Sequence, residues 1–136
     1  MNPYAGPQAY RDSAVLTASP EQLVVMLYDG AVRFLRQAEV AMNEGAWLHS
    51  FEKLGRGEAI LDELLATLNM EVGEISERLQ AIYIFCKKTL IEARIQRQGE
   101  KIAQVVALLV NLREAWAKLA EQGAASAAAP VAPASA

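Results

Sequence analysis

The stretch Ser19–Gly30, SPEQLVVMLYDG, decides the fold of this chain because it marks the start of a long apolar helix. Ser19 is a residue type preferred at a helix N-cap, Pro20 suits the first helical position, and Gln22 stands where a capping box places its second side chain. Six consecutive apolar residues follow at 23–28. The sequence therefore predicts a helix from about Pro20 to Asn43 that offers more apolar surface than one core needs.

This first helix carries one broad apolar face. Helical spacing places on it Leu23, Val24, Leu27, Tyr28, Ala31, Phe34, Leu35, Ala38 and Ala41. Val25 and Val32 lie seven residues apart and fall well off that face. We expect these two valines to form a second apolar patch that meets a partner.

Three further segments, over about 46–68, 74–96 and 100–120, repeat apolar residues at helical spacing. Their expected core positions are Trp47, Phe51, Leu54, Leu61, Leu64, Leu65 and Leu68; Ile75, Leu79, Ile82, Tyr83, Cys86, Leu90 and Ala93; and Ile102, Val105, Val106, Leu109, Leu112, Trp116 and Leu119. Strand-like alternation is absent from the sequence, and short connections favour antiparallel neighbours. The prediction is an all-α fold, an antiparallel up-down four-helix bundle.

The two ends of the chain differ in composition from this helical part. Residues 1–18 contain Pro3, Gly6 and Pro7 without a sustained helical period, and we expect a mobile N-terminal arm there. Residues 19–121 form the predicted bundle domain. From residue 122 to residue 136 the chain is almost entirely alanine, serine and proline, which predicts a disordered low-complexity tail.

Composition and charge exclude several classes of function. The net charge is −3 at pH 7, whereas a nucleic-acid-binding protein normally shows a basic patch. No apolar run approaches the length of a membrane span, and the N-terminus lacks the features of a secretory signal. The single cysteine cannot form an internal disulfide and suits a reducing compartment. We therefore expect a cytoplasmic protein without nucleic-acid binding or membrane insertion.

Metal binding and catalysis are not expected. A di-metal bundle needs Glu-x-x-His pairs on two helices, and this chain has one histidine, His49, which we place on the surface. Cys86 is expected to be a buried, unreactive thiol. Phosphate loops and nucleophile elbows are absent, so we expect no cofactor and no enzyme. A chorismate-mutase-like bundle would need inward basic residues, which the predicted inward faces lack.

Three charged residues need separate interpretation. Glu58 falls inside an apolar stripe, either as a buried acid or at an edge of the bundle beside Gly55 and Gly57, and the edge position is favoured. Asp29 and Arg33 are four residues apart, which predicts a surface ion pair on the first helix. The alternative for this pair is a role in orienting a partner's backbone.

The third helix carries a second apolar stripe. Ile84, Ile91 and Ile95 fall on the side opposite the predicted core, and Phe85 lies to one flank. The N-terminal arm, a second copy of the chain or a foreign chain would cover this stripe. A wider core than expected is the remaining alternative. An apolar surface bordered by polar residues suits a partner's amphipathic helix.

Several stretches resemble the flagellar secretion chaperone FliS family. They are Tyr10, VLTASPEQL at 15–23, MLYDGAVRFL at 26–35, AILDEL at 59–64, LIEA at 90–93 and LREAW at 112–116. The resemblance covers about residues 10–120. The chain departs from the family at Ile84 and Phe85, where an acid and a tyrosine are usual, and at Arg94, where asparagine is common.

The resemblance implies a cytosolic chaperone that binds the C-terminal helical segment of flagellin, prevents its premature polymerisation and aids its delivery to the flagellar type III export apparatus. It also implies an N-terminal arm that covers apolar surface when flagellin is absent. The expected partner-binding residues are Tyr10, Val15, Leu16, Val25, Val32, Ile84, Phe85, Ile91 and Ile95. Export-apparatus components and a homodimer remain open as partners. The alternative function is a structural homodimeric bundle or a helix-binding adaptor without flagellin specificity.

Overall fold

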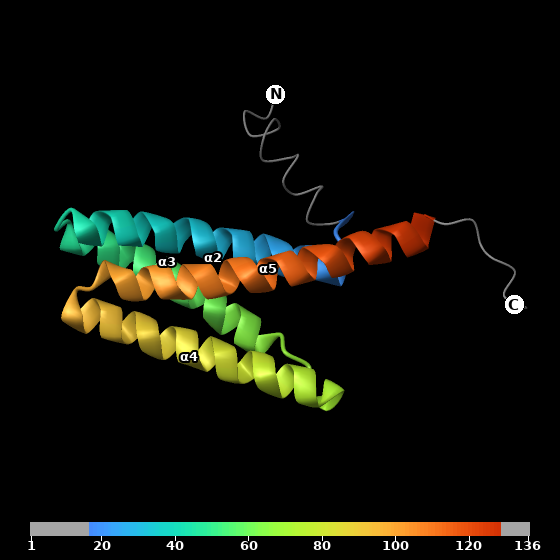
Figure 1. Cartoon of the computed structure of the whole chain (residues 1–136). Coiled ribbons are helices and arrows are strands. Elements are labelled where there is room, and N and C mark those ends of the chain that lie inside the picture. The colour runs from blue at the N-terminus through green and yellow to red at the C-terminus, as the bar shows by residue number, and fades with distance from the viewer. Residues whose placement is uncertain (1–16, 129–136) are drawn as a thin grey trace, which may run out of the picture.

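The computed structural model describes residues 17–128, with side chains described for residues 17–123. Its elements are α2 (Pro20–Asn43), α3 (Trp47–Ala66), the short 3-10 helix η1 (Met70–Val72), α4 (Glu74–Gln96) and α5 (Gly99–Ala128). Figure 1 shows successive helices running in opposite directions, with α2 packed between α3 and α5 and with α4 against α5 and α3. The described part contains no strand. The predicted all-α antiparallel four-helix bundle is confirmed.

The start of α2 has the predicted capping box. The Gln22 amide donates to the Ser19 hydroxyl at 3.1 Å, and the Ser19 amide donates to the Gln22 side chain at 2.8 Å, with Pro20 as the first helical residue. Pro20 has no amide hydrogen, so three amides at this helix end are without an intrahelical partner, and the capping box satisfies two of them. The bounds of α2 agree with those predicted from the sequence, and so do those of α4.

Helix α5 differs from its predicted length. It was expected to end near residue 120, whereas it continues to Ala128. Alanine has the highest helix propensity, and the alanine-rich sequence after residue 119 carries the helix through Gly123. The predicted boundary at residue 121 therefore lies inside a helix. The predicted arm residues Tyr10, Val15 and Leu16 lie outside the described residues.

The core lies between all four helices. Its largest fully buried side chains are Tyr28, Tyr83, Leu35, Leu54, Leu61, Leu90, Ile102 and Leu109. Val32 also belongs to the core and is only 9 % exposed, so its expected position outside the core is wrong. The reason is that α2 packs against two helices at once, which buries a wider arc than a single apolar face.

Two expected core residues are exposed instead. Ile75 is 66 % exposed because it lies in the first turn of α4, beside η1, where the bundle is hollow rather than closed. Leu119 is half-exposed near the end of α5. Both positions keep the helical period of their segments. Exposure there is set by where the neighbouring helices end.

A glycine of α3 lies in close contact with α2. A methyl group placed on Gly57 of α3 would lie 2.6 Å from the Leu35 side chain of α2, which is fully buried. One turn further along the same pair, a methyl group on Gly30 would lie 3.2 Å from Ile60. Close approach of two helices needs such small residues at the crossing. None of the described helices is both long enough and apolar enough to cross a membrane.

Candidate functional site

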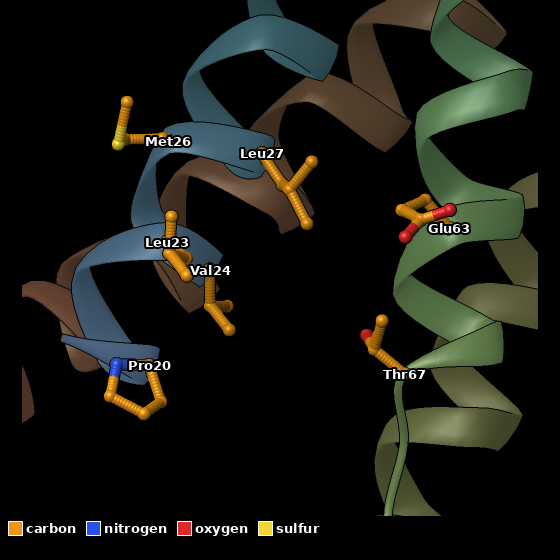
Figure 2. Close-up of a pocket in the computed structure, with 7 residues that line it drawn as sticks. All are labelled: Pro20, Leu23, Val24, Met26, Leu27, Glu63 and Thr67. Atoms are coloured by element: carbon orange, nitrogen blue, oxygen red, sulfur yellow. The ribbon is translucent and has the colours of Figure 1, made fainter. Parts of the chain in front are cut away.

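An apolar cavity of about 520 Å³ opens between the start of α2 and the end of α3. We call it the α2–α3 groove; it is lined by Pro20, Leu23, Val24, Met26, Leu27, Glu63 and Thr67. Figure 2 shows Val24 and Leu27 of α2 pointing across the gap toward Thr67 and Glu63 of α3. Leu23 and Met26 are 37 % and 40 % exposed, which is high for large apolar side chains beside a core. The groove therefore presents an uncovered apolar wall with one carboxylate at its edge.

A second cavity of about 230 Å³ adjoins the groove on the inner side. It shares Val24 and Thr67 with the groove and reaches inward past η1 to Tyr83 of α4 and Trp116 of α5. Its other lining residues are Leu64, Leu68, Asn69, Val72, Ile75, Ser76 and Leu79. Together the two cavities extend from the outside of the bundle to the buried side chain of Tyr83.

The second candidate surface is the isoleucine stripe of α4, which consists of Ile84, Ile91 and Ile95. Their exposed fractions are 53 %, 46 % and 75 %, and Phe85 on the flank is 55 % exposed. Residues 17–123 leave these side chains largely uncovered. Lys87, which lies between Ile84 and Ile91 on this side of α4, pairs with Asp62 of α3, so the stripe borders the contact between α3 and α4. The exposure that the spacing predicted is present, whereas the binding of a partner there stays a prediction.

The two valines expected to form one patch are separated. Val25 is half-buried and lines a shallow hollow of about 390 Å³ between α2 and α5, with Ala117 and Ala120 on the opposite wall. Val32 is in the core, as described above. The α2–α3 groove replaces this patch as the main apolar surface of α2. The groove was not predicted because Leu23 and Leu27 share the broad apolar face of α2 with buried residues such as Tyr28, and helical spacing does not separate the two groups.

The ion pairs also differ from those expected. Asp29 accepts a hydrogen bond at 2.9 Å from Arg113 of α5, not from Arg33, so the predicted pair within α2 is wrong. The neighbouring carboxylate of Asp29 holds the pKa of Arg113 above its usual value. A charge on an adjacent helix competes with one four residues away, and the helix contact determines which pair forms.

Glu58 has a basic partner that sequence analysis did not find. Arg94 of α4 donates two hydrogen bonds to its carboxylate, one of them at 3.3 Å between Nη1 and Oε2. The Glu58 side chain is 16 % exposed, so the pair is largely shielded from water. The same guanidinium lies 5.9 Å from the Phe51 ring. Glu58 thus belongs to a structural contact between α3 and α4.

The described residues offer few groups for catalysis. Cys86 is fully buried, and burial raises the pKa of its thiol to about 11, which suppresses the reactive thiolate. His49 is exposed. Within residues 17–123 no cluster of histidine, cysteine, aspartate and glutamate has the arrangement of a metal site. The α2–α3 groove and the isoleucine stripe are apolar surfaces instead.

The family profile described as Flagellar protein FliS matches residues 2–123. The chain belongs to the FliS family. It is 33 % identical over 116 residues to the flagellar secretion chaperone FliS of Bacillus subtilis, covering 85 % of this chain and 84 % of the relative. It is 36 % identical over 110 residues to the flagellar secretion chaperone FliS of Salmonella typhimurium, covering 79 % and 82 %.

A solved structure shares the same fold. The crystal structure of a flagellar chaperone from bacteria superposes with a TM-score of 0.72, at 20 % identity, over 85 % of this chain and 97 % of that one. Membership in the FliS family confirms the resemblance identified from the sequence. It gives the chain a chaperone role in flagellar export, and the family is not one of enzymes.

Proposed function

We propose that this FliS-family protein binds the C-terminal helical segment of flagellin in the cytoplasm. It keeps that segment from polymerising prematurely and aids its delivery to the flagellar type III secretion apparatus. The observation that carries the proposal is the α2–α3 groove, which leaves Leu23 and Met26 partly exposed beside a continuous apolar wall. An uncovered groove of this kind suits the apolar face of an amphipathic helix.

The isoleucine stripe is the second contact region in this proposal. Ile84 and Ile95 are eleven residues apart, about 16 Å along a helix, so the stripe is long enough for three turns of a bound segment. Phe85 extends this contact on the flank of the stripe, Val25 adds a separate apolar contact in the hollow between α2 and α5, and the arm residues Tyr10, Val15 and Leu16 act as a cover. Val32 is omitted because it lies in the core.

The energetics favour reversible capture. Burial of about 1,000 Å² of apolar area contributes on the order of 25 kcal/mol before costs. Ordering a disordered segment and losing translational freedom cancel much of that gain. Binding strong enough to prevent polymerisation, and weak enough to release the client for export, follows from this balance.

The test compares two sets of variants with one matched control. The groove variant is Leu23→Ser with Met26→Ser, the stripe variant is Ile84→Ser with Ile91→Ser and Ile95→Ser, and the control is Val40→Ser with Leu48→Ser. Val40 and Leu48 are 56 % and 87 % exposed and belong to neither surface. Fluorescence anisotropy with the C-terminal segment of flagellin from the same genome measures affinity, and circular dichroism checks that each variant stays helical.

We expect the groove and stripe variants to weaken binding at least roughly tenfold, as loss of buried apolar anchors does, and the control to bind like the wild type. Light scattering of full-length flagellin should show slower polymerisation with wild-type protein than with the groove variant. Unchanged affinity in both the groove and the stripe variants would contradict the proposal.

A homodimer is the competing function, and the exposed stripe is the observation that favours it. Two copies would then pair their isoleucine stripes and would need no flagellin. Sedimentation with and without the flagellin segment separates the two. A client-bound monomer is expected for the chaperone, and a dimer that ignores the segment is expected for the alternative. Export-apparatus components remain further candidate partners of the client-loaded form.

A further inference from the structure

Three cationic side chains surround one aromatic ring on the outer seam of α2 and α3. The Arg33 guanidinium lies 5.1 Å from the centroid of the Phe34 ring, the Lys53 ammonium 5.6 Å and the Arg56 guanidinium 5.7 Å. Arg33 belongs to α2 and the other two to α3. We call Arg33, Lys53 and Arg56 the basic cluster. A single ring attracts such cations weakly and is not a conventional hydrogen-bond acceptor for their N–H groups.

The positive charge of this cluster is poorly compensated. Arg56 has one acidic partner, Glu52, at 3.4 Å and on the exposed surface. Among residues 17–123, Arg33 and Lys53 form no ion pair. Three like charges within reach of one ring repel one another, and an added anion would relieve that repulsion. The cluster therefore favours a carboxylate from outside the described chain.

The basic cluster and the α2–α3 groove lie on the same seam. Phe34 follows Leu27 by seven residues on α2, and Arg56 precedes Glu63 by seven on α3. Seven residues are two helical turns, so each pair shares a helix face and is separated by about 10 Å. The seam thus has an apolar end beside the carboxylate of Glu63 and a basic end around Phe34. Its charge is opposite at its two ends.

We propose that the occupant of this seam is an amphipathic helix that lies in one direction only. Its apolar residues fill the α2–α3 groove, and carboxylates about two turns away contact the basic cluster. This inference rests on the proposed function and adds the chemistry and orientation of the bound segment. Reversed placement brings the occupant's carboxylates next to Glu63 and leaves the basic cluster unpaired, which is the electrostatically worse arrangement.

The first experiment measures binding of two synthetic helical peptides. Both carry leucine anchors at one end; one has glutamates two turns away and the other has glutamines there. The protein variant is Arg33→Gln with Lys53→Gln and Arg56→Gln. The matched control, Arg36→Gln with Arg78→Gln and Lys118→Gln, removes the same charge away from the seam. We expect the cluster variant to bind the glutamate peptide roughly tenfold more weakly.

The glutamine peptide should bind the wild type and both variants equally. The preference for glutamate should disappear near 1 M salt, where the screening length is about 3 Å. Equal loss of glutamate-peptide affinity in the cluster variant and the control variant would overturn the proposal, because a general charge effect would then explain it. A salt-independent preference would overturn it as well.

The second experiment determines orientation by disulfide trapping. One cysteine is placed at the basic end by Gln37→Cys, which is exposed one turn beyond Arg33, and another at the apolar end by Thr67→Cys. The native thiol of Cys86 is fully buried and does not compete. A glutamate peptide with a cysteine next to its carboxylates should couple to position 37 and not to position 67. Coupling to position 67, or to both equally, contradicts a single direction.

Measuring the binding of the flagellin segment alongside the peptides distinguishes failure of this inference from failure of the proposed function. If that segment binds the wild type and the cluster variant equally well, the oriented seam is wrong while flagellin binding stands. If it does not bind the wild type, the proposed function fails, and the synthetic peptides still decide the orientation. A wild-type dimer that dissociates in the cluster variant would identify a second copy as the occupant and overturn the inference.

Discussion

The hydroxyl groups of Tyr28 and Tyr83 meet inside the bundle at 2.5 Å and join helices α2 and α4 across its centre. Both side chains are at most 1 % exposed, and their rings lie 6.3 Å apart at an angle of 51°. Burial raises the pKa of both phenols, so both are neutral in ordinary buffers. Helices α2 and α4 are not neighbours in the chain. The hydroxyl pair is a direct polar link between them inside the apolar core.

Removing both hydroxyls of this pair should destabilise the fold by less than the sum of the two single removals. Tyr28→Phe and Tyr83→Phe each leave the partner hydroxyl with a lost hydrogen bond in a buried place, at a cost of about 1–3 kcal/mol. The double variant removes both polar groups and should cost less than the sum of the single changes. Urea unfolding of the four proteins forms a double-mutant cycle. Strictly additive losses would show that the two hydroxyls are not coupled.

The buried thiol of Cys86 should make the fold less stable in mild alkali. Burial raises its pKa from 9.0 to about 11. A group whose pKa is raised on folding stabilises fully below the unfolded pKa, and that contribution is lost as pH rises through the window between 9 and 11. Between pH 8 and pH 10 the loss amounts to about 1 kcal/mol.

The thiol is separated from the two buried tyrosines by comparing wild type with Cys86→Ala. Tyr28 and Tyr83 also have raised pKa values and contribute to both proteins alike. Urea unfolding at pH 8 and pH 10 should show a steeper loss for the wild type than for Cys86→Ala. Identical slopes would mean that the thiol ionises in the folded protein as readily as in the unfolded one.

Two glycines on α3 give a matched pair for the packing between α2 and α3. Gly57→Ala places a methyl group 2.6 Å from Leu35, and we expect a loss of about 1–3 kcal/mol from overpacking. Gly55→Ala meets nothing within 4 Å and should gain up to roughly 1 kcal/mol through helix propensity. Thermal unfolding of the two variants should therefore shift in opposite directions. A stabilised Gly57→Ala variant would refute the close contact.

The pair between Glu58 and Arg94 should contribute more than an exposed one. Arg94→Ala leaves the 16 %-exposed Glu58 side chain without its partner, at an expected cost of about 1–3 kcal/mol. Arg78→Ala removes the partner of Glu74, where both side chains are about three-quarters exposed, and should cost less than about 0.5 kcal/mol. Chemical denaturation at low and high salt compares them. Equal losses would mean that burial adds nothing to the pair.

Local signals along the chain predicted the helices well. The capping box at Ser19 set the start of α2, and helical periodicity gave the bounds of α4. The burial and the partners of single residues were predicted less well. Val32 is buried and Asp29 pairs with Arg113 because α5 lies along that side of α2, and a helical wheel of α2 alone contains no information on α5.

The candidate site was predictable only in part, because the pattern of one helix does not show how its neighbours lie. The exposure of Ile84, Ile91 and Ile95 follows from two stripes on one helix, which a single core cannot bury. The α2–α3 groove depends on how far two helices diverge, and apolar spacing does not give that distance. One signal was available, since Gly57 interrupts an apolar stripe where alanine would make a better helix.

The contact between Gly57 and Leu35 also sets how far α2 and α3 lie apart at the α2–α3 groove, although neither residue lines it. Two helices held at one contact diverge with distance from it. Leu23 and Thr67, which line the groove, lie farther along the helices than this contact. A bulkier residue at position 57 would widen the groove without altering any of the residues that line it. The width of the groove is therefore adjustable from outside its lining, and a search confined to the lining residues would overlook position 57.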